Sequence, residues 1–516
     1  MASIINSFAI SGIEGYLVEI ETDTLYGKPS ISIIGLGDRA IKEASERIQA
    51  AIICKGYEFP KMKIVINLAP GGIKKRGSHF DLGMAIGLLI RSNQIVPKDI
   101  NLNDFGFIGE LSLNGNIRPC SGVLPMVIAA KKSGIKKVIV PLENIGEARL
   151  VNGVEAYGFD DLKSIIDFIE GSGKTNSIVS DKNLELKPNY PIDFGDVKGQ
   201  DILIEYIEYI VVAAAGGHNM LMIGTPGCGK SMIAKRIPTI LPKMGEEEAL
   251  EVTKVYSVAG LLKNKGNLVT ERPFRAPHHS ASLNSLIGGG NNAMPGEVSL
   301  AHNGVLFLDE VAEFSKKTLD ALRQPMEDKK VTVARVNSTN TYPANFMFIA
   351  AMNPCPCGYH GTKKCKCTDY EILKYRQKVS GPILDRIDIQ KYVHPVDFIN
   401  LTEDKKSRSS VKLRERVERA REIQRLRYKG IKDVNCNAQM TPGLIKEYCQ
   451  LEEDSKGLLR MAYDRYGYSA RTYDKFLKIA RTFADLDNSP KIRKEDIMNV
   501  LLSRDLDKEK TRMYTV

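Results

Sequence analysis

Short apolar runs alternate with helical patterns over the first third of the 516-residue chain. The runs that predict β-strands lie at 31–34, 63–67, 105–108 and 138–140. Apolar residues recur with helical spacing at 40–53 and 83–91, which predicts two helices in the same region. This mixture of elements predicts an α/β or α+β domain over residues 1–170.

The rest of the chain divides into three segments by the same criterion. Residues 171–190 are polar and aperiodic, which predicts a linker. Residues 191–395 alternate strand and helix patterns in the manner of a doubly wound parallel sheet, and residues 396–516 are mostly helical in pattern. No apolar run reaches the roughly 18 residues of a membrane span, and the first residues lack a signal-peptide pattern. We therefore expect a cytoplasmic protein without a membrane partner.

A glycine-rich loop follows an apolar run in the third segment. The loop reads G-x-x-x-x-G-K-S over residues 224–231, between a predicted strand at 219–223 and a predicted helix from Met232. Backbone N–H groups of such a loop wrap phosphates at a helix N-terminus. Lys230 is then expected to contact the β and γ phosphates, and the Ser231 hydroxyl is expected to bind Mg²⁺.

Two further apolar runs end in polar residues. The run 305–308 ends in Asp309 and Glu310, and the run 346–352 ends in Asn353. One carboxylate can hold Mg²⁺, the next can polarise a water for attack on the γ-phosphate, and an amide can orient that water. Acidic strand ends and turn-forming asparagines are common, but the position of these residues relative to the loop favours function. The predicted nucleotide-binding residues are Gly224, Thr225, Pro226, Gly227, Cys228, Gly229, Lys230, Ser231 and Asp309.

The segments 196–200, 272–279, 295–302 and 353–358 resemble the YifB/ComM family, which lies in the magnesium-chelatase-like branch of the AAA+ ATPases. The resemblance covers essentially the whole chain. It implies an AAA+ α/β core with ATP and Mg²⁺ as cofactors, followed by a C-terminal helical lid. It also implies a homo-oligomeric ring, with a hexamer as the expected size.

The resemblance also implies a role for each polar residue of the site. Walker A corresponds to Lys230 and Ser231, and Walker B to Asp309 and Glu310. Sensor 1 corresponds to Asn353, the arginine finger to Arg386 and sensor 2 to Arg471. Glu310 is the expected catalytic base, and the finger acts on the nucleotide of a neighbouring subunit. The alternative for Arg386 is a surface salt bridge with Asp385 or Asp388, and Arg323 is a second candidate for the finger.

Two other regions resemble known parts of related proteins. Residues 330–346 predict a β-hairpin, which resembles the hairpin that points into the ring pore in this AAA+ branch, with Arg335 and Asn337 near its tip. Residues 121–141 resemble the proteolytic domain of Lon, a fold of the S5 domain 2 type. Peptidase chemistry there needs a serine activated by a lysine. The lysine position falls on Leu124, and Ser78 lacks the glycine-rich nucleophile turn, so we expect a non-proteolytic domain.

Four of the nine cysteines lie within 13 residues. They are Cys355, Cys357, Cys365 and Cys367. Four thiolates suit tetrahedral Zn²⁺, so a structural zinc site is one hypothesis. Reduced thiols and a redox pair are the alternatives. The remaining cysteines are scattered, and an odd total argues against a disulfide framework.

The net charge of +11 lies entirely beyond residue 170, because residues 1–170 hold 19 basic and 19 acidic side chains. Residues 401–430 hold 11 basic against 5 acidic ones. Such a surface indicates a polyanionic partner or simply a solvated basic helix. The resemblance implies single-stranded or branched DNA as the partner, with branch migration or helicase activity in recombination and natural transformation. A chelatase motor and a protein-remodelling ATPase are the alternatives. No integrin-like domain and no aromatic pore loop are recognisable to support them.

Overall fold

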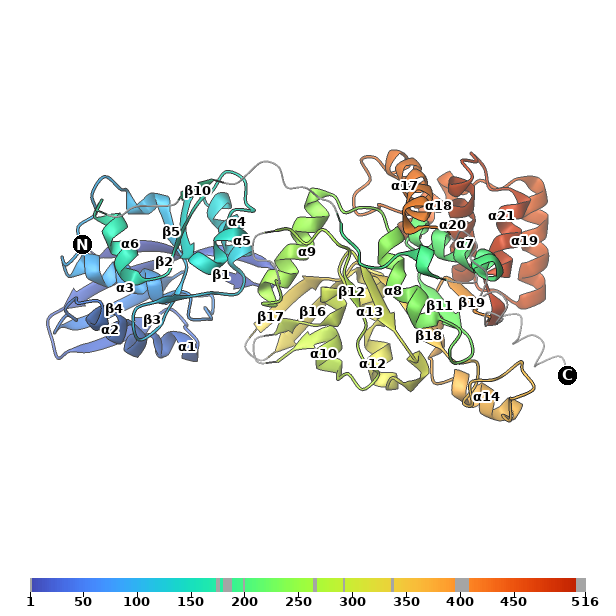
Figure 1. Cartoon of the computed structure of the whole chain (residues 1–516), viewed down its shortest axis with the longest axis horizontal. Helices are drawn as coiled ribbons and strands as arrows, with labels where there is room; N and C mark the ends of the chain where they lie inside the picture. The colour runs from blue at the N-terminus through green and yellow to red at the C-terminus, as the bar shows by residue number, and fades with distance from the viewer. Residues whose placement is uncertain are drawn as a thin grey trace. The chain divides into compact units, whose positions relative to one another are not determined.

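The computed structural model describes residues 2–172, 177–179, 188–197, 200–262, 267–290, 293–335, 338–394 and 408–506. The chain forms two compact units. Unit 1 comprises Met1–Leu186, Glu246–Val269 and Val336–Tyr342, and unit 2 comprises Lys187–Gly245, Thr270–Arg335 and Pro343–Val516. Figure 1 colours the chain from the N-terminus to the C-terminus and labels its elements. Most of the predicted linker at 171–190 lies outside the described residues.

Unit 1 is built on a mixed eight-stranded sheet with the order β10-β9-β8-β5-β1-β2-β4-β3. The strands are β1 (Ser3–Ser11), β2 (Glu14–Leu25), β3 (Ser30–Ile34), β4 (Lys63–Ala69), β5 (Phe105–Phe107), β8 (Lys137–Pro141), β9 (Glu155–Phe159) and β10 (Ser177–Val179). The four predicted strands are confirmed as β3, β4, β5 and β8. The hairpin of β1 and β2 is not predicted, because the fully buried Ser7 and Thr22 interrupt its apolar alternation.

Helices of unit 1 supply the apolar side chains that pack on this sheet. They include α1 (Arg39–Lys42), α2 (Ala44–Cys54), α3 (Asp81–Arg91), α4 (Val123–Lys132), α5 (Ile145–Ala148) and α6 (Leu162–Ile169). Both predicted helices are confirmed, the first as α1 and α2 and the second as α3. Gly83 allows α3 to approach the sheet closely, because a Cβ atom there would lie 2.7 Å from Ile20 Cδ1.

Unit 1 also contains a helix from the segment predicted as the doubly wound core. The backbone N–H of Gly122, at the start of α4, donates to the carbonyl of Ser257 in α9 (Glu246–Val258) over 3.0 Å. The Ser257 hydroxyl donates to the buried carboxylate of Glu147, which also accepts from the Leu124 N–H at 2.9 Å. These polar contacts within the interior fix α9 to unit 1.

Unit 2 contains a five-stranded sheet with the order β12-β15-β18-β11-β19. The strands are β11 (Met220–Ile223), β12 (Phe274–Arg275), β15 (Val305–Leu308), β18 (Met347–Met352) and β19 (Ile389–Tyr392). All neighbouring pairs are parallel. Every residue of β11, β15 and β18 is buried, as expected for the centre of a parallel sheet. The parallel α/β prediction is therefore confirmed, and the carboxyl ends of these strands meet at one edge.

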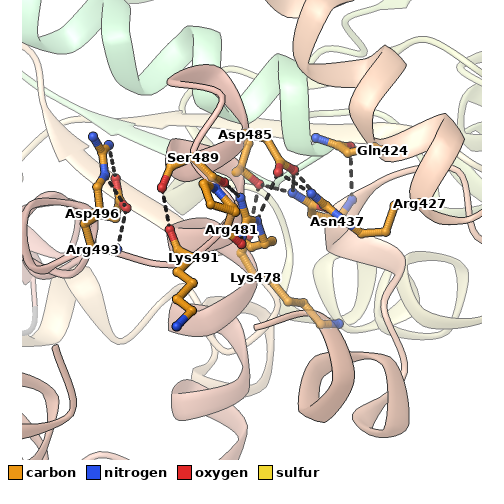
Figure 2. A network of polar contacts seen from close by, with 12 residues as sticks. Gln424, Arg427, Asn437, Lys478, Arg481, Asp485, Ser489, Lys491, Arg493 and Asp496 are labelled. Carbon is orange, nitrogen blue, oxygen red and sulfur yellow. Dashed lines mark hydrogen bonds and ion pairs between the residues drawn. The ribbon is translucent and has the colours of Figure 1, made fainter. Parts of the chain in front are cut away.

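The C-terminal part of unit 2 is helical, as predicted. Its helices are α17 (Ser410–Arg427), α18 (Pro442–Tyr448), α19 (Glu453–Tyr466), α20 (Ala470–Leu486) and α21 (Lys494–Leu502). A buried ionic network joins α17 to α20 (Figure 2). Asp485 is fully buried and accepts from Arg427 Nη1 at 2.8 Å, Arg481 Nε at 3.0 Å and Asn437 Nδ2 at 2.8 Å. No helix in the described part of the chain is long and apolar enough to span a bilayer.

Candidate nucleotide-binding site

A cavity of about 390 Å³ opens where the carboxyl ends of β11, β15 and β18 meet. Its lining residues are Pro226, Gly227, Cys228, Gly229, Lys230, Ser231, Met232, Asp309, Glu310 and Asn353. Seven of the nine predicted nucleotide and magnesium residues are in that list, and Gly224 and Thr225 are not. Three segments that are distant in the sequence therefore supply one site, as the motif spacing predicts.

The glycines of the loop are required by its backbone and by its packing. Gly227 and Gly229 have φ values of +80° and +88°, a region that non-glycine residues rarely adopt. A Cβ atom on Gly224 would lie 2.6 Å from Cys228 Sγ and from the carbonyl oxygen of Val393. The helix α8 (Lys230–Ile240) begins directly after Gly229, so its N-terminus faces the cavity and favours an anion there.

The ammonium group of Lys230 lies at the floor of the cavity. Nζ donates to the carbonyl oxygens of Gly224 at 2.7 Å and Thr225 at 3.0 Å, and lies 3.5 Å from Asn353 Oδ1. The side chain is buried, so its charge is poorly screened by solvent. This position suits an amine that contacts phosphate oxygens, and it connects the loop to the end of β18.

The magnesium and catalytic carboxylates lie opposite the loop. Ser231 Oγ donates to Asp309 Oδ2 at 2.5 Å, which brings together two oxygen atoms of the kind that Mg²⁺ binds. Glu310 adopts a left-handed conformation, with φ 49° and ψ 48°, and its side chain is exposed. The backbone N–H of Glu310 donates to Asp309 Oδ1 at 3.0 Å, and a non-glycine residue in this conformation is a strained feature of the kind found at functional sites.

His279 is a neighbour of this site that the sequence patterns did not single out. Its Nδ1 atom lies 3.8 Å from Glu310 Oε2, and its ring contacts that of His278 with centroids 4.0 Å apart and the two planes tilted by 35°. The sequence gives His279 only as part of the segment 272–279, with no role. Met232, at the third position of α8, also lines the cavity without having been predicted.

The three candidate arginines do not line the cavity of their own chain. Arg386 Nη2 pairs with Glu327 at 2.5 Å, and Nη1 donates to the Pro382 carbonyl at 2.7 Å. The proposed alternative partners of Arg386 are therefore wrong in detail, since Glu327 takes the place of Asp385 and Asp388. Arg323 and Arg471 are exposed at the starts of α13 (Arg323–Asp328) and α20.

Asp388 has other partners. It accepts from the Asn219 N–H at 3.0 Å and lies 3.6 Å from His218 Nδ1 and 3.8 Å from Lys475 Nζ. Burial opposes its charged form, but these partners together lower the pKa of Asp388 to about 2. Asp388 therefore anchors the start of β19 as a charged group.

The strands of the predicted pore hairpin are present as β16 (Lys330–Arg335) and β17 (Ser338–Pro343). Residues 336–337, which include Asn337, lie outside the described residues, and so does the side chain of Arg335. In unit 1, the Ser78 hydroxyl donates to the Glu110 carboxylate. Leu124, at the lysine position of the Lon resemblance, is fully buried in α4.

The predicted basic helix, α17, spends much of its charge inside unit 2. Arg416 pairs with Glu208 at 2.7 Å, and Arg414 Nε donates to the Thr239 carbonyl at 2.7 Å. Arg421 and Arg427 likewise bond to groups of unit 2. Most of the arginines of α17 therefore hold unit 2 together. Both sequence-based interpretations, a solvated helix and a phosphate-binding surface, left out this structural role.

The four clustered cysteines are brought together, with sulfur atoms all within 4.8 Å of one another. The Sγ atom of Cys355 lies 3.3 Å from that of Cys357 and 3.9 Å from that of Cys365, and the last two are 3.7 Å apart. The backbone N–H groups of Lys366 and Tyr359 lower the pKa of Cys357 to about 6. The cluster could hold a zinc ion, because metals bind the thiolate form.

Comparison with known proteins extends over nearly the whole chain. Three family descriptions match: "Magnesium chelatase, subunit ChlI" over residues 193–401, "Subunit ChlI of Mg-chelatase" over 20–144 and "Magnesium chelatase, subunit ChlI C-terminal" over 407–504. The chain is 38% identical to Competence protein ComM of Haemophilus influenzae over 497 residues, which is 95% of each chain. It is 37% identical to the uncharacterized protein YifB of Escherichia coli over 509 residues, 98% of this chain and 97% of YifB.

A shorter similarity supports a Lon-like element. Lon protease 2 of Bacillus subtilis is 31% identical over 183 residues, which is 32% of each chain. The full-length similarities decide the family, since they include the loop, both strand ends and the helical C-terminal part. The chain belongs to the YifB/ComM family of magnesium-chelatase-like AAA+ ATPases.

Proposed function

We propose that unit 2 binds ATP with Mg²⁺ and hydrolyses it, and that the chain works as a cytoplasmic, ring-forming motor on DNA. The observation that carries the ATPase proposal is the convergence of Lys230, the bonded pair of Ser231 and Asp309, Glu310 and Asn353 on one cavity. Each of these groups matches one requirement of phosphoryl transfer to water.

The division of work follows from the geometry. The α8 N-terminus and Lys230 bind the phosphates, and the Ser231 and Asp309 oxygens would hold Mg²⁺, which would neutralise charge that develops on the phosphates. Glu310 accepts a proton from the attacking water, and Asn353 orients that water. The Glu310 side chain is exposed to solvent, so a water can reach it.

Completion of the site requires a second subunit. Arg386 lies outside the cavity of its own chain and is held by Glu327, so it acts on the nucleotide of a neighbouring protomer. Arg471 closes over the nucleotide from the helical lid as sensor 2. Both assignments need a homo-oligomeric ring, for which we propose six subunits.

DNA is the proposed partner because of the similarity to a competence protein and the predicted pore hairpin. The hairpin segment, which includes Arg335 and Asn337, contacts the nucleic-acid backbone, and ATP turnover moves it along the strand. Branch migration or helicase work in recombination and natural transformation follows. Unit 1, with Ser78 bonded to Glu110, contributes assembly or guidance of DNA rather than peptide hydrolysis.

A labelled four-way junction tests this function. We expect the purified protein with ATP and Mg²⁺ to convert the junction into duplex products, and Glu310→Gln to bind ATP without converting it. Loss of a general base costs about 10²–10⁴ in rate. An intact ATPase that leaves junctions and forked duplexes unchanged would contradict the DNA proposal and favour a protein-remodelling or chelatase motor.

A further inference from the structure

The cysteine cluster lies in the segment that directly continues the catalytic strand. Asn353 ends β18 and lines the cavity, and Cys355 follows it after a single proline. From Asn353 to Cys367 the chain forms no helix or strand, and then α14 (Asp369–Arg376) begins with Thr368 as its N-cap. The conformation of residues 353–367 therefore depends on interactions other than the hydrogen bonds of a helix or a sheet.

The sulfur atoms have the spacing that a metal would impose. A tetrahedral zinc ion with Zn–S bonds of about 2.3 Å places its sulfur ligands about 3.8 Å apart. The Sγ separations among Cys355, Cys357 and Cys365 are 3.3, 3.7 and 3.9 Å, and Cys367 lies within 4.8 Å of all three. Cys355 is fully buried, whereas Cys357, Cys365 and Cys367 are partly exposed, so the cluster lies near the surface with one sulfur in the interior.

The turn that joins the first two cysteines rests on the phosphate loop. The Gly358 N–H donates to the Cys355 carbonyl at 3.0 Å, and the φ of Gly358 is +84°. A Cβ atom on Gly358 would lie 2.9 Å from both Cδ and Cγ of Pro226. Pro226 lines the nucleotide cavity, so the cysteine turn and the phosphate loop are in direct contact.

The other side of the segment is anchored independently of the cysteines. Arg376, in the last turn of α14, donates through Nε to the Pro354 carbonyl at 3.3 Å and through Nη2 to Tyr392 Oη at 3.0 Å. The chain is therefore held at Pro354 and at α14. The four cysteines lie between these points, and Gly358, which contacts Pro226, belongs to the turn that begins at Cys355.

We propose that Cys355, Cys357, Cys365 and Cys367 bind one zinc ion, and that the zinc-held turn fixes the phosphate loop through the contact of Gly358 with Pro226. Zinc loading then sets the affinity of the site for nucleotide. This inference rests on the proposed ATP site, whose loop it supports. Without the metal, no covalent bond joins the four sulfurs, and the turn opens.

Metal content and nucleotide affinity are measured on the same full-length samples. Elemental analysis is expected to find one zinc per chain, and cobalt substitution is expected to give the intense ligand-field bands of a tetrahedral thiolate site. Zinc is removed with a zinc-selective chelator and then restored. Binding of a fluorescent ATP analogue is expected to weaken about tenfold on removal, equivalent to ~1.4 kcal/mol, and to recover on restoration.

Two glycine variants separate the metal from the contact. Gly358→Ala keeps all four sulfurs but places a methyl group against Pro226, so it is expected to retain zinc and lose nucleotide affinity. Gly361→Ala is its matched control, because Gly361 has the same kind of backbone, with φ +83°, and no atom within 4 Å of an added Cβ. Cys365→Ser is expected to lose both zinc and affinity, whereas Cys54→Ser, an exposed cysteine of α2, is expected to lose neither.

Each failure has its own signature. Wild-type protein without bound zinc, or with iron or a disulfide in its place, overturns the zinc site. The link to the loop is overturned if the wild type binds one zinc per chain but nucleotide affinity is the same in the wild type, in the protein stripped of zinc and in Gly358→Ala. The ATP site is judged separately, since it fails only if Lys230→Ala binds the analogue as well as the wild type. Circular dichroism of every variant identifies any that has not folded.

Discussion

Replacing Arg386 by alanine distinguishes an arginine finger from a surface salt bridge. Arg386 pairs with Glu327 at 2.5 Å; the Arg386 side chain is 15% exposed and the Glu327 side chain 57% exposed, so solvent screens the pair from the Glu327 side. A pair of this kind contributes no more than about 1 kcal/mol to stability. A finger contributes ~10³–10⁵ in kcat, which corresponds to about 4–7 kcal/mol of transition-state stabilisation. The two interpretations therefore differ by several kcal/mol.

Glu327→Ala is the matched control, because it breaks the same ion pair and leaves the guanidinium in place. We expect Arg386→Ala to lose at least about three orders of magnitude in kcat, while Glu327→Ala stays within a few-fold of the wild type. The assay is steady-state ATP hydrolysis at saturating ATP, with the oligomeric state checked by light scattering. Similar rates for the two variants, whether both high or both low, would refute the finger assignment.

A mixing experiment adds a test that one chain cannot pass alone. Rings that combine Arg386→Ala and Lys230→Ala subunits contain some interfaces with an intact finger beside an intact phosphate loop. We expect such mixtures to recover activity that neither variant has by itself. An absence of recovery at every mixing ratio, in rings shown to contain both subunits, would contradict action between subunits.

Three further predictions concern stability and DNA. Asp485→Ala leaves the guanidiniums of Arg427 and Arg481 buried without their carboxylate (Figure 2), so urea unfolding is expected to show a loss of about 3–5 kcal/mol; a loss below about 1 kcal/mol would show that the network is dispensable. Burial lowers the pKa of His79 from its ordinary value of 6.5 to about 4. The unfolded chain therefore binds a proton between these pH values that the folded chain does not, so stability is present above pH 6.5 and falls by up to about 3 kcal/mol as the pH approaches 4. His79→Gln should flatten that part of the stability profile, and an unchanged profile would contradict the assignment. Arg335→Ala should lower ATP hydrolysis stimulated by DNA but leave the DNA-free rate unchanged; equal stimulation in the variant would remove Arg335 from the DNA contact.

The parts of the site that are local in sequence could be predicted, whereas long-range pairings could not. The loop at 224–231 and the strand ends at Asp309 and Asn353 each carry a local signal, and a parallel sheet brings such ends to one edge. The partner of Arg386, Glu327, is 59 positions away in the sequence. Sequence proximity instead favours Asp385 and Asp388, which lie within two residues of Arg386. Nothing local distinguishes these three carboxylates.

Two other features depend on tertiary packing in the same way. The helix α9 belongs to unit 1 through Ser257 and Glu147, which are 110 positions apart. Its sequence pattern places α9 in the parallel α/β core of unit 2, because it lies between the phosphate loop and β12 in the sequence. The excess of basic residues at 401–430 is real, but it does not mean that all of this charge faces a partner. Arg416 and Arg427 are paired inside the fold with Glu208 and Asp485. Charge in a sequence does not show whether its partner lies in solvent or in the fold.

ATP hydrolysis in the presence of different DNA structures tests the central claim most directly. The rate is compared without DNA and with single strands, linear duplex and a four-way junction, using Lys230→Ala to define the background. We predict that single-stranded or junction DNA stimulates the wild type strongly and the variant not at all. Hydrolysis that depends on Lys230 but is indifferent to every DNA would keep the nucleotide site and contradict the DNA motor.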